Sequence, residues 1–366
     1  MTAPFLLSVI IPCYNCQDYI YECLQSVYCQ IDDSVEIIVI NDGSTDNSLK
    51  EIELFINKSK KNTIKLITQI NQGVSAARNT GIDASSGKYL AFLDGDDLWD
   101  SSFWEKIRPT LELNDVDLVE FNANRFYDGC KEKITPVSIV SANELLTINS
   151  VSDLRETFLK SEWFPWARVY KRFLFDTLRF PVGRHYEDIA LIPKTYLSSK
   201  RVKRMTDVLV LYRVRQESIT NTPKKGDIDD IVYALGVFNE LLNTKCKGEI
   251  ETIAPSVHLT FSLARRISSS VHGYCSFNKD QIHDIKKAIN PFLSTQKTSK
   301  KIKFFFIREY CLIKKSNISL ELIGKNHKNA LPMIGSFSNS IRHIPRPKTH
   351  NDPVRQYLIR LVVHAT

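Results

Sequence analysis

The chain has 366 residues, of which 43% are hydrophobic and 25% charged, and its formal net charge is +8. This composition excludes a disordered chain, and the length predicts two domains with a large core. No apolar run approaches the roughly 18 to 20 residues that span a bilayer, and Met1 to Leu7 lack the basic start of a secretion signal. We therefore expect a cytoplasmic protein. The eight scattered cysteines show no disulfide framework, which agrees with that compartment.

Apolar and amphipathic segments alternate along the first hundred residues. They predict strand and helix in turn, over residues 6–12, 19–28, 35–40, 48–58, 64–69, 74–85 and 89–94. Apolar runs rich in Val, Ile and Leu that are followed by helical patterns are typical of parallel strands buried on both faces. The sequence therefore predicts an α/β fold, with a doubly wound, mostly parallel sheet flanked by helices.

Two of the predicted strands end abruptly in carboxylates. Asp42 follows the second strand, and the fourth strand runs into Asp94-Gly95-Asp96. Because the carboxyl ends of parallel strands line the ligand crevice of an open sheet, we expect one shared site there. Paired carboxylates suit Mg²⁺ or Mn²⁺ bound together with substrate phosphates. An acidic turn, in which Asp94 caps the next segment, explains the same residues.

The second half of the chain has a different pattern. Thr222 to Gly226 is a candidate linker, and helical periodicity returns over residues 228–242, 250–272 and 279–292. We predict an α/β domain of residues 1–220, followed by a helical, basic C-terminal region of residues 221–366. From Lys297 onward there are 14 Lys and Arg residues but only 3 Asp and Glu residues. Such a segment suits an anionic membrane surface or nucleic acid, and a solvated basic surface explains it equally well.

Four motifs in this order resemble glycosyltransferase family 2. They are Ser-Val-Ile-Ile-Pro-Cys-Tyr-Asn at 8–15, Asn-Asp-Gly-Ser-Thr-Asp at 41–46, Asn-Gln-Gly-Val-Ser-Ala-Ala-Arg-Asn-Thr-Gly at 71–81 and Phe-Leu-Asp-Gly-Asp-Asp at 92–97. The resemblance covers residues 5 to 220. It implies the GT-A fold, a nucleoside-diphosphate-sugar donor, a divalent cation and inversion at the anomeric carbon.

The resemblance also assigns roles to single residues. Pro12 and Tyr14 match residues that wall the nucleotide base, Asp94 matches a ribose ligand, and Asp96 matches the metal ligand. Asp42 matches an aspartate that hydrogen-bonds a pyrimidine ring. A carboxylate only accepts, so it can select the imide NH of uracil, and we favour a UDP-sugar. The alternative for Asp42 is a cap on the helix that follows.

Three arginines match residues near the donor diphosphate. Arg78 lies in the Ala-Arg-Asn-x-Gly motif, and a guanidinium can bond two phosphate oxygens at once. Gly73 precedes the same helix, whose start attracts anions. Arg213 and Arg215 match a Tyr-Arg element and alternate as on a strand, so both point the same way. The alternative for Arg78 is a charged residue on the surface of a helix. The alternative for Arg213 and Arg215 is a solvated strand at the edge of the sheet.

A transferase also needs a base for its acceptor hydroxyl. The resemblance assigns this role to Asp188; Glu187 is its main rival, and His185 is a further candidate. Both acidic residues also suit a helix start, where they complement the helix dipole. The stretch Trp166–Arg172 resembles the family too, although Ala167 and Arg168 replace the usual Asn and Lys. Because of these replacements, the resemblance does not assign the residues that bind the acceptor.

The family implies assembly of a surface polysaccharide such as O-antigen or capsule. The acceptor would be a saccharide, free or linked to undecaprenyl diphosphate, and the chain would then sit at the cytoplasmic face of the inner membrane. Because the family often works on lipid-linked acceptors, we favour an anionic membrane surface over nucleic acid as the partner of the basic segment. Two other classes stay open: a sugar-nucleotide-binding module without catalysis, and a nucleotidyltransferase on a related fold. For the latter we find no Gly-rich, Arg-bearing loop after the first strand to hold a triphosphate.

Overall fold

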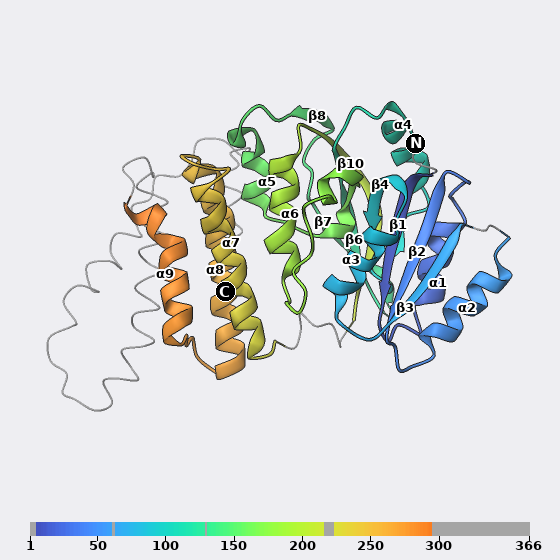
Figure 1. Cartoon of the computed structure of the whole chain (residues 1–366), viewed down its shortest axis with the longest axis horizontal. Helices are drawn as coiled ribbons and strands as arrows, with labels where there is room; N and C mark the ends of the chain where they lie inside the picture. Colours follow the sequence, from blue (N-terminus) through green and yellow to red (C-terminus); the bar gives the residue numbers. More distant parts are fainter. Residues whose placement is uncertain (1–4, 61–62, 129, 216–222, 295–366) are drawn as a thin grey trace, which may run out of the picture.

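A computed structural model of the chain describes residues 5–60, 63–128, 130–215 and 223–294 (Figure 1). Its strands are β1 (Phe5–Cys13), β2 (Val35–Asp42), β3 (Ile64–Gln69), β4 (Gly87–Phe92), β5 (Leu98–Trp99), β6 (Leu118–Tyr127), β7 (Cys130–Val137), β8 (Glu144–Thr147), β9 (Arg168–Lys171) and β10 (Arg201–Val214). Its helices are α1 (Ile20–Tyr28), α2 (Ser48–Lys58), α3 (Val74–Ala84), α4 (Phe103–Leu113), α5 (Arg155–Lys160), α6 (Glu187–Ser198), α7 (Gly226–Asn243), α8 (Ile250–His272) and α9 (Lys279–Ser294). Short 3₁₀ turns cover Val151–Leu154, Pro165–Ala167 and Arg172–Phe175.

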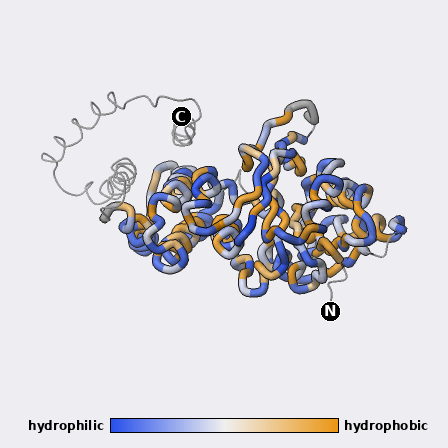
Figure 2. Tube along the Cα trace, turned by 90° about the horizontal axis from the view of Figure 1, so that it is seen from above, coloured by the Kyte–Doolittle hydropathy of each residue, from blue (hydrophilic) through white to orange (hydrophobic). Residues whose placement is uncertain are grey.

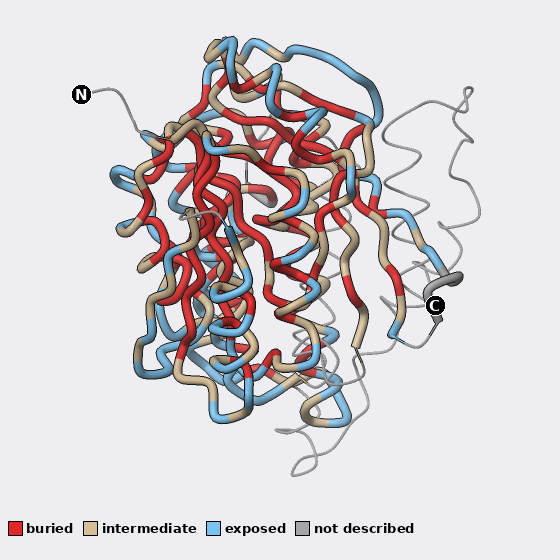
Figure 3. Tube along the Cα trace, turned by 90° about the vertical axis from the view of Figure 1, so that its right-hand side faces the viewer, coloured by how far each residue is buried: buried red, intermediate tan, exposed pale blue. Residues whose placement is uncertain are grey.

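The predicted alternation of strand and helix is confirmed in the first hundred residues. Strands β3, β2, β1 and β4 lie side by side in this order and run parallel. All eight residues of β2 are buried, as expected for a strand covered on both faces. The buried residues concentrate on the strands, and the exposed ones on the surrounding turns (Figure 3). The ends of β1, β2 and β4 therefore share one edge of the sheet.

Beyond β4 the sheet becomes mixed. Strand β9 lies antiparallel between β4 and β6, and β10 runs parallel to β6. On its other side β10 pairs with β8 over residues 201–204 and with β5 at Val210 and Leu211. The pairing of Leu211 with Leu98 brings the end of β10 beside the turn that follows β4. This pairing places Arg213 near the acidic motif.

The predicted C-terminal helices are present and cover the side of the molecule away from α1 and α2 (Figure 1). One hydrophobic cluster continues from Phe92 of β4 through Ile192 of α6 to Phe238 of α7 and Phe261 of α8. Hydrophobic segments run through both halves of the chain (Figure 2). The division predicted at residue 220 falls within residues 216–222, outside the described residues, and stays a prediction.

Two further sequence expectations concern membranes. The basic segment from Lys297 onward lies outside the described residues. Within the ranges that are described, none of the helices combines the length and the apolar character needed to cross a bilayer.

Candidate active site

The acidic turn after β4 packs onto the end of β1. The amide of Asp97 donates to the carbonyl of Asp94 at 2.9 Å, which closes the turn. A Cβ at Gly95 would lie 3.0 Å from the carbonyl oxygen of Pro12, tighter than ordinary contact. Glycine is therefore what allows the turn to lie against the buried end of β1. This packing fixes Asp94 and Asp96 at the edge where the parallel strands end.

Arg78 joins this turn to a distant part of the chain. Its Nη2 lies 2.7 Å from Oδ1 of Asp94, and its Nη1 lies 2.6 Å from Oε1 of Glu187. The side chain is buried and its guanidinium lies over the Phe180 ring. The alternative, that Arg78 is a charged residue on the exposed surface of the helix, is therefore excluded. Burial opposes its charge, but the two carboxylates outweigh this and raise the pKa of Arg78. The end of β4 and the start of α6 thus form one cluster.

Asp96 and Asp97 have different environments. Nη2 of Arg215 lies 2.6 Å from Oδ2 of Asp96, whose side chain is 16% exposed. Asp97 is completely buried, and its Oδ1 accepts the backbone amide of Arg213 at 2.8 Å. Burial raises the pKa of Asp96 and raises that of Asp97 well above its usual value. Asp97 therefore serves the packing of the turn, whereas Asp96 is the one that ligands can reach.

Arg213 and Arg215 lie on the same side of the chain, as the alternation predicts, and both guanidinium groups lie over the Tyr19 ring. Arg213 is 5% exposed and pairs with Glu22 at 2.7 Å and with Asp128 at 2.8 Å. Arg213 is therefore not solvated, although over residues 212–214 strand β10 pairs with β6 alone among the described strands. Arg213 holds the turn in place, and Arg215 contacts the carboxylate that faces outward.

Asp42 is buried at the end of β2 and holds the segment that follows β3. Its carboxylate accepts from Nε2 of Gln69 at 2.7 Å and from the backbone amides of Gln72 and Gly73 at 3.0 and 2.8 Å. Asp42 thus holds the residues just before α3, whose first residue is Val74, and the expectation that this helix start attracts an anion stays a prediction. Asp46, not Asp42, accepts the first amide of α2, at 2.9 Å.

The two residues that are predicted to line the pocket for the nucleotide base lie at the end of β1. Pro12 is buried, whereas Tyr14 is 47% exposed. The loop after β1 is tied to the loop after β2, because Oδ1 of Asn15 accepts the amide of Thr45 at 2.9 Å. The open ring of Tyr14 therefore lies next to the segment that carries Asp42. One strand, β1, separates Asp42 from the acidic turn, a distance of roughly 10 Å.

Asp188 is the second residue of α6 and directly follows the partner of Arg78. Its Oδ1 accepts the amide of Ile189 at 2.8 Å. Burial, reinforced by the neighbouring charge of Glu187, raises the pKa of Asp188 to about 7. Glu187 is paired with Arg78, and Asp188 stays our prediction for the base.

His185 lies in a second polar cluster, with Asp227 and Asp230 of α7. Nδ1 of His185 is 2.7 Å from Oδ1 of Asp227, and possible ligand atoms of the three side chains lie within 4.8 Å of one another. Nη1 of Arg184 lies 3.1 Å from Oδ1 of Asp230 and supplies a positive charge there. Hydrogen bonds and this ion pair account for the cluster. Sequence reasoning missed both aspartates, because no motif surrounds them.

The departure from the family pattern at Arg168 has a structural reason. Arg168 is 1% exposed, and its Nε donates to the hydroxyl of Tyr196 at 2.6 Å. Tyr196 lies on α6 and also bonds to buried Glu120. The arginine therefore fixes α6 against the sheet and has no access to an acceptor.

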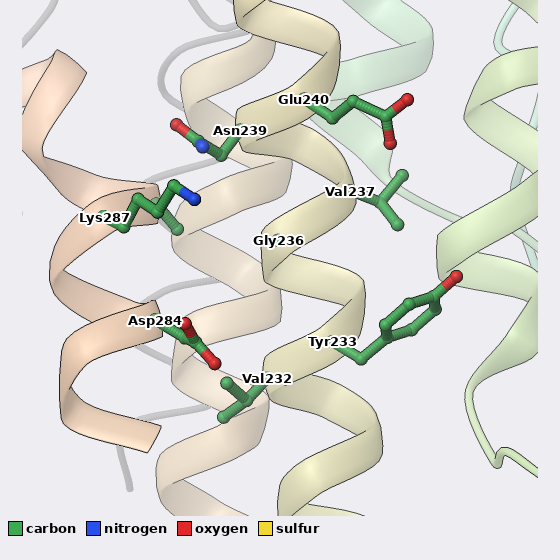
Figure 4. Close-up of a pocket in the computed structure, with 9 residues that line it drawn as sticks. Val232, Tyr233, Gly236, Val237, Asn239, Glu240, Asp284 and Lys287 are labelled. Atoms are coloured by element: carbon green, nitrogen blue, oxygen red, sulfur yellow. The ribbon is translucent and has the colours of Figure 1, made fainter. Parts of the chain in front are cut away.

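A pocket of about 280 Å³ lies elsewhere, between α7 and α9 (Figure 4). Its lining includes Tyr233, Glu240, Asp284 and Lys287. None of the predicted site residues lines it. The predicted site is therefore the open edge of the sheet and not this pocket.

Comparisons with known proteins show the family and the fold of the chain. Residues 8–179 match the family described as Glycosyl transferase family 2. The glycosyltransferase EpsJ of Bacillus subtilis is 30% identical over 301 residues, which is 79% of this chain and 83% of the relative. Glycosyltransferase GlyA of Streptococcus pneumoniae is 33% identical over 58% of this chain, although the match spans only 31% of that protein.

A solved structure of S. aureus TarS in complex with UDP-GlcNAc has the same fold. Its TM-score is 0.62 at 18% identity, and the match covers 88% of this chain and 93% of that chain. At this identity the likeness concerns the fold alone. Because a relative 30% identical is matched over most of both chains, this chain belongs to glycosyltransferase family 2, and its fold is GT-A.

Proposed function

We propose that the chain transfers a sugar from a nucleoside-diphosphate sugar to a hydroxyl group of an acceptor, with inversion at the anomeric carbon. The observation that carries this proposal is Arg78, whose guanidinium links Asp94 at the sheet edge to Glu187 beside Asp188. It joins the donor-side carboxylates to a group that can accept a proton. The structure of TarS with UDP-GlcNAc supports a UDP-sugar, and we favour a UDP-hexose.

The residues at the sheet edge fit a divalent cation. Asp96 offers carboxylate oxygens, the donor type that Mg²⁺ and Mn²⁺ prefer. A cationic group, the guanidinium of Arg215, already lies against Asp96, so this carboxylate is placed to pair with positive charge. When bound, the ion would neutralise charge on the departing diphosphate. Arg215 would then leave Asp96 and bond the diphosphate oxygens.

The reaction we propose is a direct displacement. The carboxylate of Asp188 accepts the proton of the acceptor hydroxyl as its oxygen bonds to the anomeric carbon. The bond from that carbon to the diphosphate oxygen breaks on the opposite face, and no covalent enzyme intermediate forms. Arg78 keeps one oxygen of Asp94 engaged, which leaves the other for the ribose. Tyr14 and Asp42 would bind the base.

The acceptor and the pathway are proposed from the family alone. We propose a saccharide acceptor, free or linked to a lipid diphosphate, in the synthesis of a surface polysaccharide. An acceptor of this kind would bring the enzyme to the membrane surface.

The function is tested by offering UDP-, GDP- and dTDP-sugars with Mn²⁺ and measuring binding by calorimetry and the release of nucleoside diphosphate. We expect UDP-sugars to bind and to be turned over. Binding of a donor without turnover, across a range of saccharide acceptors, would support a binding module instead.

The metal is tested separately with Asp96→Asn. We expect this substitution to weaken UDP binding in the presence of Mn²⁺ by about 100-fold, because a neutral amide is a poor ligand for a hard cation. Binding without the ion should change little. The control is Asp83→Asn, at an exposed carboxylate on α3. Equal responses to Mn²⁺ in the two variants would exclude Asp96 as the ligand.

The pKa of Asp188 predicts the pH profile. A base must be ionised to accept a proton, and burial raises the pKa of Asp188 to about 7. The turnover number should therefore be low in acid, rise as the pH passes through about 7, and level off above it. Initial rates at saturating donor over this range test the prediction. A rate that stays constant well below neutral pH would place the base elsewhere.

A further inference from the structure

The first turn of α7 contacts the loop that leads into α6. The backbone amide of His185 donates to Oδ2 of Asp230 at 3.0 Å, and Nδ1 of the same histidine lies 2.7 Å from Oδ1 of Asp227. Nη1 of Arg184 lies 3.1 Å from the other oxygen of Asp230. Both aspartates therefore bind the loop of residues 184–186, which lies immediately before Glu187 and Asp188.

This loop has a backbone conformation that needs outside support. Gly183 has φ of 74°, which glycine adopts without strain, whereas Tyr186 has φ of 58° in the same left-handed region. Tyrosine is unfavourable there, by on the order of 1 kcal/mol, and Tyr186 is the residue directly before α6. A strained backbone persists only where its surroundings hold it. The contacts from α7, together with the stacking of Arg184 on the Tyr233 ring at 4.2 Å, supply that support.

The supporting helix is itself firmly placed. Oδ2 of Asp227 accepts the amide of Lys224 at 2.8 Å, and the side chain of Asp227 is buried. The next apolar residues, Ile228 and Ile231, are buried in the core cluster that also contains α6 and α8. The aspartates thus project from a rigid element, beyond residues 8–179 that match the family.

We propose that Asp227 and Asp230 are positioning residues that hold the loop of residues 184–186 and so set the place of Asp188 in the site. The proposal rests on Asp188 being the base in the proposed function. It makes the helical region part of the catalytic machinery, because a displacement of a reacting group by about 1 Å can lower turnover about 100-fold.

The test is Asp230→Ala, which removes the acceptor for the His185 amide and the partner of Arg184. We expect turnover to fall by about 10- to 100-fold, with the donor KM and UDP affinity unchanged within about twofold, because no donor-side contact is lost. The matched control is Asp229→Ala on the same helix. Its carboxylate bonds Nε2 of Gln281 on α9 at 2.6 Å, away from the loop, and its turnover should stay near wild type.

A second readout distinguishes positioning from general destabilisation. Asp188 is surrounded by Glu187 on its own helix, Arg78 on α3, Tyr170 on β9 and Tyr186 in the loop. Burial is the main cause of its raised pKa, so a loosened loop that admits water should move the acidic limb of the rate profile to lower pH in Asp230→Ala. Partial unfolding would lower the rate without moving the limb.

The outcomes separate the two proposals. If Asp188→Asn keeps its turnover, the assignment of the base is wrong. If Asp188→Asn is inactive while Asp230→Ala keeps both its turnover and its acidic limb, the positioning role is overturned. Should Asp230→Ala fail to fold, Asp230→Asn and Asp227→Asn provide the same comparison with side chains of equal size.

Discussion

Asp188→Asn is expected to lower turnover by about 10²- to 10⁴-fold, the usual contribution of a positioned base. The amide has the size of the carboxyl group but cannot accept the acceptor proton. Donor binding should stay within about threefold of wild type, because the carboxylates at the sheet edge and their arginine partners are untouched. Calorimetry with UDP and Mn²⁺ measures the binding, and single-turnover transfer measures the chemistry.

Glu187→Gln is the informative companion to this substitution. Glu187 pairs with Arg78 at 2.6 Å. Loss of this carboxylate should therefore disturb the site, weaken donor binding and lower the turnover number. If Glu187→Gln abolished transfer with donor binding intact, and Asp188→Asn did not, the base would be Glu187.

Arg78→Met is expected to lower the free energy of unfolding by about 3 to 5 kcal/mol, because it removes the shared buried cation of two carboxylates whose side chains are 29% and 13% exposed. The guanidinium lies within 2.7 Å of Asp94 and within 2.6 Å of Glu187, and the side chain of Arg78 is 4% exposed. Urea denaturation followed by circular dichroism gives the change in stability. Turnover should be lost as well, since the start of α6 is no longer tied to β4.

The matched control for Arg78 is Arg179→Met. Arg179 pairs with Asp83 at 3.0 Å, but its side chain is 40% exposed and that of Asp83 is 66% exposed. An exposed pair of this kind contributes about 0 to 1 kcal/mol. Equal stability losses in the two variants would show that the buried cluster is not what joins β4 to α6.

Much of the fold could be predicted from local patterns. Helix α2, strand β3 and helix α8 have the bounds that periodicity predicted, because each is a clear apolar pattern ended by polar residues or glycine. The mixed half of the sheet was not predicted. Strand β9 pairs with β4 and β6, which lie far from it along the chain, and such pairing leaves no local signal.

The sequence motifs supply the candidate residues of the site, but not the contacts that these residues make. Motif order singled out Arg78 and Asp96, yet nothing in the sequence indicated that Arg78 would bridge two carboxylates or that Arg215 would lie on Asp96. Glu22 and Asp128, the partners of Arg213, are single acidic residues without a motif. Long-range ion pairs depend on the tertiary structure, and they cannot be predicted from local patterns in a single sequence.

The most direct test of the central claim is the anomalous diffraction of Mn²⁺ in crystals grown with UDP. The claim is that the carboxylates at the sheet edge gather around a cation-bound sugar nucleotide, next to Asp188. We predict an ion bonded to Asp96, with Arg215 withdrawn from that carboxylate and turned toward the diphosphate. An ion held instead by His185, Asp227 and Asp230, or a nucleotide bound away from Asp42 and Asp96, would contradict the account.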